Sequence, residues 1–183
     1  KRRGSSADEV SFYDATAGTN ILPVLHSQQY DYYLAIGPRV TERIGKARSI
    51  QSILDVGCGA GILTTFYARE HPERRFVGID RSSASIARAT EQAQALALTN
   101  VQFECLDFEH MPSTYFSDLV LATHVLVQAE QDPGVPSRSW NTFERAGESE
   151  LQADFERRTG IGARLDRLNA LLSAQGRMIV FEK

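Results

Sequence analysis

Three glycines at alternate positions mark the stretch of this chain that is best suited to bind a ligand through its backbone. They are Gly57, Gly59 and Gly61, and they follow a short apolar run that contains Asp55. Glycine has no side chain and tolerates positive φ angles, so the backbone can pass close to a ligand. An apolar strand, a glycine turn and a following segment with helical spacing are typical of a nucleotide-binding corner. The same pattern also occurs as a tight connection without a ligand.

The spacing of the glycines separates two kinds of nucleotide ligand. The dinucleotide fingerprint is G-x-G-x-x-G, whereas here the third glycine comes one residue early and is followed by Ile62 and Leu63. Asp55 places a carboxylate two residues before the first glycine. A carboxylate repels a pyrophosphate and attracts a ligand that carries positive charge. The pattern therefore favours a positively charged ligand over a dinucleotide.

A second acidic residue lies where nucleotide folds bind ribose. Asp80 ends the apolar segment 75–80, nineteen positions after Gly61. In such folds an acidic residue at about this distance accepts hydrogen bonds from the ribose hydroxyls. The alternative is that Asp80 only caps the helix that follows. Its occurrence together with the glycines favours ribose binding, and we include Arg81 beside it among the expected site residues.

Alternating strands and helices predict an α/β fold with a parallel sheet. Five apolar segments indicate strands, at residues 53–56, 75–80, 101–105, 118–123 and 177–181. Helices are expected after residue 61, from Ser82 or Ser83 to Leu96, and over 165–172. Before the first strand, a polar tail (1–9) and an aromatic segment precede a helix over 27–46, which Pro38 bends or divides. We expect part of this leader to line the site, although each of its tyrosines is more simply a packing residue.

The segment Asp55-Val-Gly-Cys-Gly-Ala-Gly resembles the first motif of the class I, Rossmann-like S-adenosylmethionine-dependent methyltransferases. The resemblance covers residues 50–183 and implies a three-layer α/β sheet with strand order 3-2-1-4-5. It also implies that Asp107 accepts the adenine amino group and that Phe108 packs on the adenine ring. The residues that we expect to bind S-adenosylmethionine are Asp55, Gly57, Cys58, Gly59, Gly61, Asp80, Arg81, Asp107, Phe108 and Thr123.

The resemblance also sets an expectation for the end of the chain. In that family two further strands, one of them antiparallel, follow the fifth strand, where this sequence stops. An uncovered apolar edge strand invites pairing with other chains. We therefore expect a fragment, a disordered or removed tail, or an oligomer or partner chain that covers this edge.

We divide the chain into an N-terminal tail and helical cap (1–49) and a cofactor-binding core (50–183). The core contains a long polar insertion at about 128–162, with Trp140 and a helix around 149–158. The insertion leaves from the carboxyl edge of the sheet. It could form a substrate wall, or be a plain surface excursion.

Methyl transfer from a sulfonium depends mainly on alignment of the reacting atoms. Where the acceptor must also lose a proton, a histidine with a pKa near 6.5 is suited to remove it. His124 follows Thr123 at the end of the fourth strand and is the candidate base, although a lone histidine is more often structural. We therefore expect methyl transfer to oxygen or nitrogen of a small molecule. A non-catalytic cofactor-binding or regulatory module is the alternative, and an NAD(P)-dependent oxidoreductase comes third.

Composition sets the outer bounds of the prediction. A length of 183 residues and a net charge of −3 fit one domain without general attraction to nucleic acid or anionic membranes. The acidic balance and the aromatic leader favour a small-molecule acceptor. No long apolar span or secretory leader is present, so a cytoplasmic protein is expected. Two cysteines are too few for a disulfide framework or a metal cluster, and we interpret Cys58 and Cys105 as small core residues.

Overall fold

The computed structural model describes residues 6–17, 29–112, 114–126, 153, 156–157 and 160–181. Most of the predicted insertion, including Trp140 and nearly all of the helix expected around 149–158, lies outside these residues. The helices and strands named below belong to the described part of the chain.

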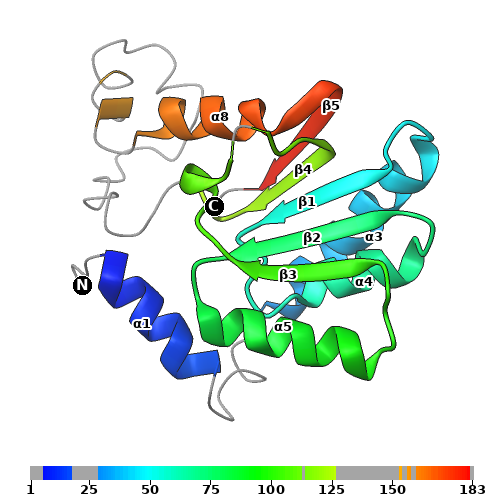
Figure 1. The fold of residues 1–183 in the computed structure, drawn as a ribbon, viewed down its shortest axis with the longest axis horizontal. Helices are drawn as coiled ribbons and strands as arrows, with labels where there is room; N and C mark the ends of the chain where they lie inside the picture. Colours follow the sequence, from blue (N-terminus) through cyan, green and yellow to red (C-terminus); the bar gives the residue numbers. More distant parts are fainter. Residues whose placement is uncertain are drawn as a thin grey trace.

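The centre of the fold is a parallel five-stranded sheet with the order β3-β2-β1-β4-β5 (Figure 1). The strands are β1 (Ser52–Val56), β2 (Arg75–Asp80), β3 (Val101–Cys105), β4 (Ser117–Thr123) and β5 (Leu172–Phe181). The predicted order 3-2-1-4-5 is confirmed. The order reverses between β1 and β4, and open α/β sheets bind ligands outside the carboxyl ends of the strands at such a switch point.

Helices cover the sheet from both sides because each face presents apolar side chains. On one face, α3 (Tyr30–Lys46) and α4 (Ile62–Glu70) pack with α5 (Ser83–Ala95) over Ile53, Phe76 and Leu119. On the other face, α8 (Ile161–Ala170) and the 3₁₀ turn η1 (Phe108–His110) cover Leu54 and Val120. Within the described residues no helix is long and apolar enough to cross a membrane.

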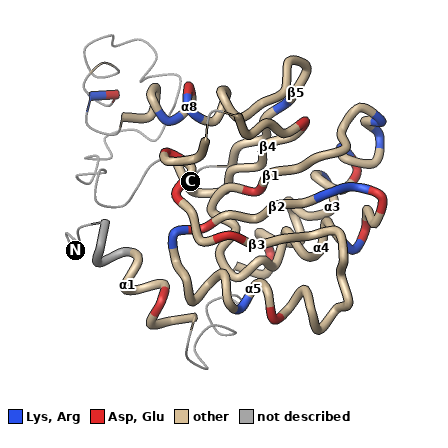
Figure 2. Tube along the Cα trace, in the orientation of Figure 1, with Lys and Arg blue, Asp and Glu red and all other residues tan. Residues whose placement is uncertain are grey.

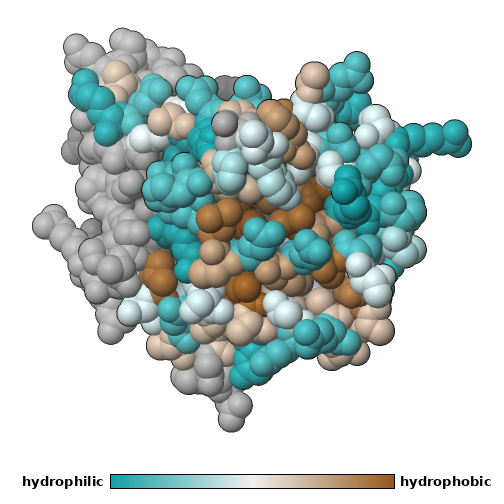
Figure 3. Space-filling model, in the orientation of Figure 1, coloured by the Kyte–Doolittle hydropathy of each residue, from teal (hydrophilic) through white to brown (hydrophobic). Residues whose placement is uncertain are grey.

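Part of one face of the sheet, and its β5 edge, are less completely covered in the described part of the chain. Figure 3 shows apolar residues gathered over the middle of the face seen in Figure 1. Half-buried Val77, Leu106 and Tyr115 pack on the apolar layer of that side. At the edge, β5 pairs with β4, and its Ile179 and Phe181 are only partly buried. The expectation that a partner chain or an oligomer covers this edge stays a prediction.

The leader departs from the expected pattern. A first helix, α1 (Ser6–Ala17), forms where a polar tail and an aromatic segment were expected, and it lies beside the start of α5 (Figure 1). The next helix begins at Tyr30 rather than at residue 27 and continues through Pro38. The proline is on the exposed side, where the loss of one backbone hydrogen bond can be replaced by water.

Two predictions near the sheet edges are wrong. Cys105 is exposed rather than in the core, because β3 is an outer strand of the sheet. Leu172 belongs to β5 and not to the preceding helix, which ends at Ala170. The strand is longer than the predicted 177–181 because a register shift lets Leu172 pair with Ser117 before the regular ladder resumes at Leu119.

One carboxylate fastens three strands at the edge opposite the predicted site. Asp118 Oδ2 accepts hydrogen bonds from the Gln51 N–H, the Ser52 N–H and the Ser52 hydroxyl at 2.9–3.0 Å. Its Oδ1 accepts from the Ser173 hydroxyl at 3.1 Å. Although partial burial acts in the opposite direction, these hydrogen bonds lower the pKa of Asp118. The hydrogen bonds of Asp118 therefore join the starts of β1, β4 and β5 as long as its carboxyl group is ionised.

Replacing Asp118 with alanine should lower the free energy of unfolding by about 1–3 kcal/mol at neutral pH, because the donors of Ser52 lose their acceptor. The depressed pKa means that this contribution is present above the unfolded pKa near 4 and is lost as pH falls through the folded pKa. Urea unfolding at pH 7 and pH 3 measures both effects. Asp166→Ala, on the exposed side of α8, is the control. An equal loss at both pH values would contradict the role of the charge.

Candidate functional site

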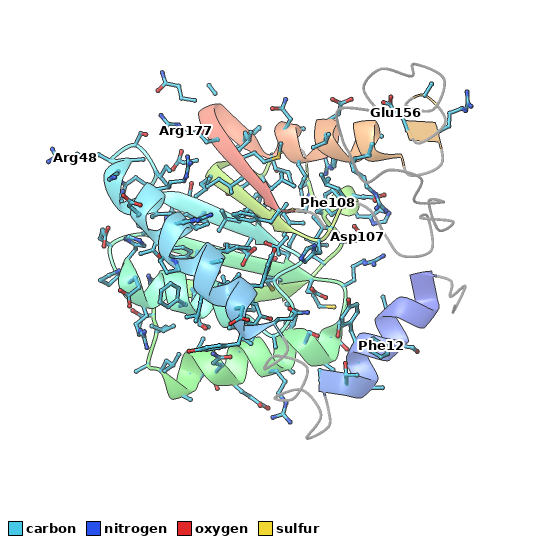
Figure 4. The ribbon with its side chains drawn as sticks, turned by 180° about the vertical axis from the view of Figure 1, so that it is seen from behind. Phe12, Arg48, Asp107, Phe108, Glu156 and Arg177 are labelled. Atoms are coloured by element: carbon cyan, nitrogen blue, oxygen red, sulfur yellow. The ribbon has the colours of Figure 1, made fainter. Side chains whose placement is uncertain are left out.

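A cleft of about 390 Å³ opens at the carboxyl edge of the sheet. The structure brings together around it all the predicted site residues except Gly61, and these are Asp55, Gly57, Cys58, Gly59, Asp80, Arg81, Asp107, Phe108, Thr123 and His124. The leader contributes further lining residues from α1 and from the start of α3, which are Val10, Phe12, Tyr13, Thr16, Gln29, Tyr32 and Tyr33. Figure 4 labels Phe12 on α1 and Asp107 and Phe108 at the neighbouring end of the sheet.

The three glycines of the loop have different physical roles, although all have positive φ. A Cβ on Gly57 (φ +70°) would lie 2.2 Å from Val125 Cγ1. A Cβ on Gly61 (φ +74°) would lie 2.7 Å from Ala89 Cβ, so Gly61 is required for packing and not for lining the cleft. At Gly59 (φ +53°) a Cβ would meet no protein atom within 4 Å. Gly59 is therefore where the backbone is open to a ligand.

The backbone N–H groups at the start of the loop are already bonded within the protein. Gly57 N–H and Cys58 N–H donate to Ile79 O at 2.8 and 3.0 Å, and Gly59 N–H donates to Asp80 Oδ2 at 2.9 Å. A phosphate-binding loop instead points such groups at its ligand. The loop is therefore not arranged as a phosphate cradle.

Asp80 connects the loop to the next helix. While Oδ2 accepts from Gly59 N–H, Oδ1 accepts from Ser82 N–H at 2.8 Å. Ser82 is the N-cap of α5 and its hydroxyl accepts from Ser85 N–H at 3.1 Å. The N-cap residue of α5 is therefore Ser82 and not Asp80. An ionised carboxylate has about four lone-pair sites, so Asp80 retains acceptor capacity at the cleft.

Asp55 is a buried carboxyl group at the base of the cleft. It is 5% exposed, and its Oδ2 accepts a hydrogen bond from Thr64 Oγ1 at 2.5 Å. Burial raises the pKa of Asp55 to about 7, the hydrogen bond from Thr64 opposes this, and the charge of Asp80 adds to it. Burial and the same two carboxyls also raise the pKa of the Cys58 thiol, which therefore stays protonated.

The turn after β3 is held by two arginines, Arg164 and Arg167, that were not among the predicted site residues. Asp107 Oδ1 accepts a hydrogen bond from Glu109 N–H at 3.0 Å and so caps the start of η1. Phe108, the first residue of η1, is buried. From α8, Arg164 donates to Glu109 Oε1 at 2.9 Å and to Leu126 O at 3.0 Å, and Arg167 donates to Phe108 O at 3.2 Å. The sequence signal that could have identified such a residue is a charged side chain on the apolar side of a predicted helix. A buried arginine in that position needs hydrogen-bond acceptors from the rest of the fold.

His124 sits at the end of β4 in a backbone conformation that few non-glycine residues adopt. Its φ is +56°, and its N–H donates to Phe181 O at 2.8 Å. The imidazole is exposed and stacks on Tyr32 of α3, with ring centroids 5.2 Å apart and an interplanar angle of 29°. Such strained residues concentrate at functional sites. His124, which follows β4, therefore lines the cleft and is held there by its contact with α3, a helix far from it in the sequence.

Comparison with known proteins agrees with this geometry. The family described as "Methyltransferase domain" matches residues 48–158, which is more than half of the chain. The chain belongs to the class I S-adenosylmethionine-dependent methyltransferases. The matched region includes the glycine loop, Asp80, Asp107 and His124.

Curated relatives of this chain differ in the acceptors that their names give. It is 34% identical over 97 residues to a tRNA (guanine-N(7)-)-methyltransferase of Rubrobacter xylanophilus, a match that covers 53% of this chain and 41% of the relative. It is 28% identical over 149 residues to a malonyl-[acyl-carrier protein] O-methyltransferase of Acetivibrio thermocellus, covering 72% and 51%. The chain thus spans about half of the length of these relatives or less.

Solved structures support the fold of this chain. The DhpI–SAH complex matches with a TM-score of 0.59 at 18% identity and covers 98% of this chain and 70% of that one. Coclaurine N-methyltransferase bound to N-methylheliamine and SAH matches with a TM-score of 0.57 at 19% identity, covering 80% and 35%. At these identities the likeness concerns the fold alone.

The glycines give a prediction that separates packing from ligand binding. Gly59→Ala should cost about 1–2 kcal/mol of stability, from its positive φ, and should weaken binding of S-adenosylhomocysteine. Gly57→Ala should cost about 1–3 kcal/mol more, because its Cβ also overlaps Val125. Thermal unfolding and calorimetric titration measure the two effects. Equal stability of the two variants would contradict this division of roles.

Asp55 predicts an unusual dependence of stability on pH. Since its folded pKa of about 7 is above the unfolded value near 4, the folded state holds a proton that the unfolded state releases. The free energy of unfolding should therefore fall as pH rises from about 4 to 7. Asp55→Asn should remove this part of the decline, and its amide oxygen can still accept from Thr64. Urea unfolding of both chains at pH 5 and pH 8 tests it, and identical pH dependence would show that Asp55 ionises normally.

Proposed function

We propose that this chain transfers a methyl group from S-adenosylmethionine to an oxygen or nitrogen of a small-molecule acceptor. The observation that carries the proposal is the loop itself. Its first N–H groups bond to Ile79 O and Asp80 Oδ2, and its open position, Gly59, faces a cleft with carboxyl groups. That arrangement fits a nucleoside ligand with positive charge and no phosphate.

The residues around the cleft fit the parts of this cofactor. We assign the ribose hydroxyls to the remaining acceptor sites of Asp80, and the adenine to Asp107 and Phe108. Asp55 offers a negative charge, once ionised, to the sulfonium and amino groups. Gly57, Cys58, Arg81 and Thr123 complete the wall, and Gly61 lets α4 pack close to α5.

When bound, the cofactor supplies an electrophilic methyl group, so the protein mainly has to align the acceptor and exclude water. His124 is the residue we propose as general base for an acceptor that must lose a proton. Its ring lines the cleft at the end of β4 and is fixed against Tyr32. A base so placed contributes roughly 10²–10⁴-fold to the rate.

The charge of the cleft favours a small acceptor over a nucleic acid. The described lining residues include three carboxyl groups, which belong to Asp55, Asp80 and Asp107. Against these, the described lining has a single side chain of the lysine or arginine type, that of Arg81. Figure 2 shows acidic residues where β1, β2 and β3 end, whereas basic and acidic residues are mixed at the opposite edge. Nucleic-acid binding depends on neutralising phosphates. Because tRNA methyltransferases are among the relatives, a tRNA acceptor is the competing proposal.

Transfer of labelled methyl groups distinguishes these acceptors. The chain is incubated with methyl-labelled S-adenosylmethionine and either bulk tRNA or a panel of small amines, carboxylic acids and phenols. We expect label in a small molecule and a loss of about 10²–10⁴-fold in His124→Asn with unchanged cofactor affinity. Label in tRNA would overturn the acceptor class. Cofactor binding without transfer to any acceptor would favour a non-catalytic binding module.

Asp80→Ala should weaken S-adenosylhomocysteine binding by about 10- to 150-fold, the equivalent of about 1.5–3 kcal/mol for charged hydrogen bonds. Asp80→Asn should lose less, because its amide oxygen still accepts one of the backbone N–H groups. Asp166→Ala removes the same charge at an exposed residue that does not line the cleft, and it is the matched control in calorimetric titration. If Asp80→Ala and Asp166→Ala bind equally well, Asp80 does not hold the ribose.

A further inference from the structure

Asp14 ties the leader helix α1 to the cofactor cleft through a capping contact between two helices. Its Oδ1 accepts from the Ser82 hydroxyl at 2.5 Å and from Ala84 N–H at 3.2 Å. These donors belong to the first turn of α5, where backbone N–H groups lack partners within the helix and negative charge is favoured. Asp14 therefore supplies part of the cap of α5 from another helix.

The polar contacts matter because apolar burial does little to hold α1 in place. Of the α1 side chains described from Val10 onward, Ala17 is the buried one, and Phe12 and Tyr13 are 47% and 49% exposed. A second anchor accompanies Asp14, since Arg88 of α5 donates to Ala17 O at 3.0 Å. Removal of these contacts would leave α1 with little apolar area to keep it on the domain.

Ser82 links this cap to the proposed ribose site. Its hydroxyl donates to Asp14, and its backbone N–H donates to Asp80 Oδ1. The two carboxylates thus hold the same serine from two sides. On α1, Phe12 and Tyr13 lie within one turn of Asp14, and both line the cleft, with ring centroids 5.5 Å apart.

We propose that Asp14 is a positioning residue for the cofactor site. It docks α1 on the start of α5 and so places Phe12 and Tyr13 in the wall of the cleft beside Asp80. The inference rests on the proposed function, because it assigns α1 to the binding of the same cofactor. Apparent affinity falls in proportion to the fraction of molecules in which the binding-competent arrangement is formed. Undocking of α1 therefore weakens binding without any change at Asp80.

The test compares Asp14→Ala, Asp14→Asn and the control Asp166→Ala in the full chain. Calorimetric titration with S-adenosylhomocysteine gives the affinity, and hydrogen exchange of the free chains reports whether α1 is docked. For Asp14→Ala we expect about 5- to 20-fold weaker binding and faster exchange of the α1 and Ala84 amides. Asp14→Asn keeps an oxygen that can accept both hydrogen bonds. It should stay within about 3-fold of the wild type, as should Asp166→Ala.

The outcomes separate this inference from the proposed function. Faster exchange in Asp14→Ala with unchanged affinity would show that α1 is docked but takes no part in binding, which overturns the inference alone. Equal exchange in all chains would show that Asp14 does not dock α1, and this result also overturns only the inference. Failure of the wild-type chain to bind S-adenosylhomocysteine would overturn the proposed function and the cofactor role of Asp14 with it.

Discussion

The site depends on one carboxylate that holds two chain segments together. Asp80 accepts the Gly59 N–H from the loop after β1 and the Ser82 N–H from the start of α5. Backbone donors of this kind need partners wherever water is excluded, so the loop and the helix share one geometry. The hydroxyl of Ser82 continues the connection to Asp14 on α1. The residue to which we assign the ribose hydroxyls thus also contacts the glycine loop and, through Ser82, is connected to the leader.

The charge of the cleft explains why a glycine corner can serve a ligand other than a dinucleotide. In this loop the N–H groups of Gly57 and Cys58 are used by Ile79 O, so little positive potential remains for a pyrophosphate. The carboxyl groups of Asp55 and Asp80 add negative potential instead. Because Asp55 is buried and titrates near neutral pH, a cationic ligand and a proton compete for the same charge.

Most of the core could be predicted from the sequence because its signals are local. Short apolar runs, the glycines and the strand-end residues Asp80, Asp107 and His124 placed the strands and the candidate site where the structure has them. What could not be predicted depends on contacts between distant segments. Helix α1 makes polar contacts to α5 that no local pattern predicts, and Leu172 joins β5 through a shifted register with Ser117. The buried Arg164 finds its acceptors only after α8 packs on η1.

The most direct test of the central claim is a calorimetric titration of the wild-type chain with S-adenosylhomocysteine, in parallel with NADH. We predict one site of about micromolar affinity for the former and no measurable binding of the latter, because the loop and its carboxyl groups disfavour a pyrophosphate. Binding of NADH with no binding of S-adenosylhomocysteine would contradict the account. It would show that the corner holds a dinucleotide despite the spacing of its glycines.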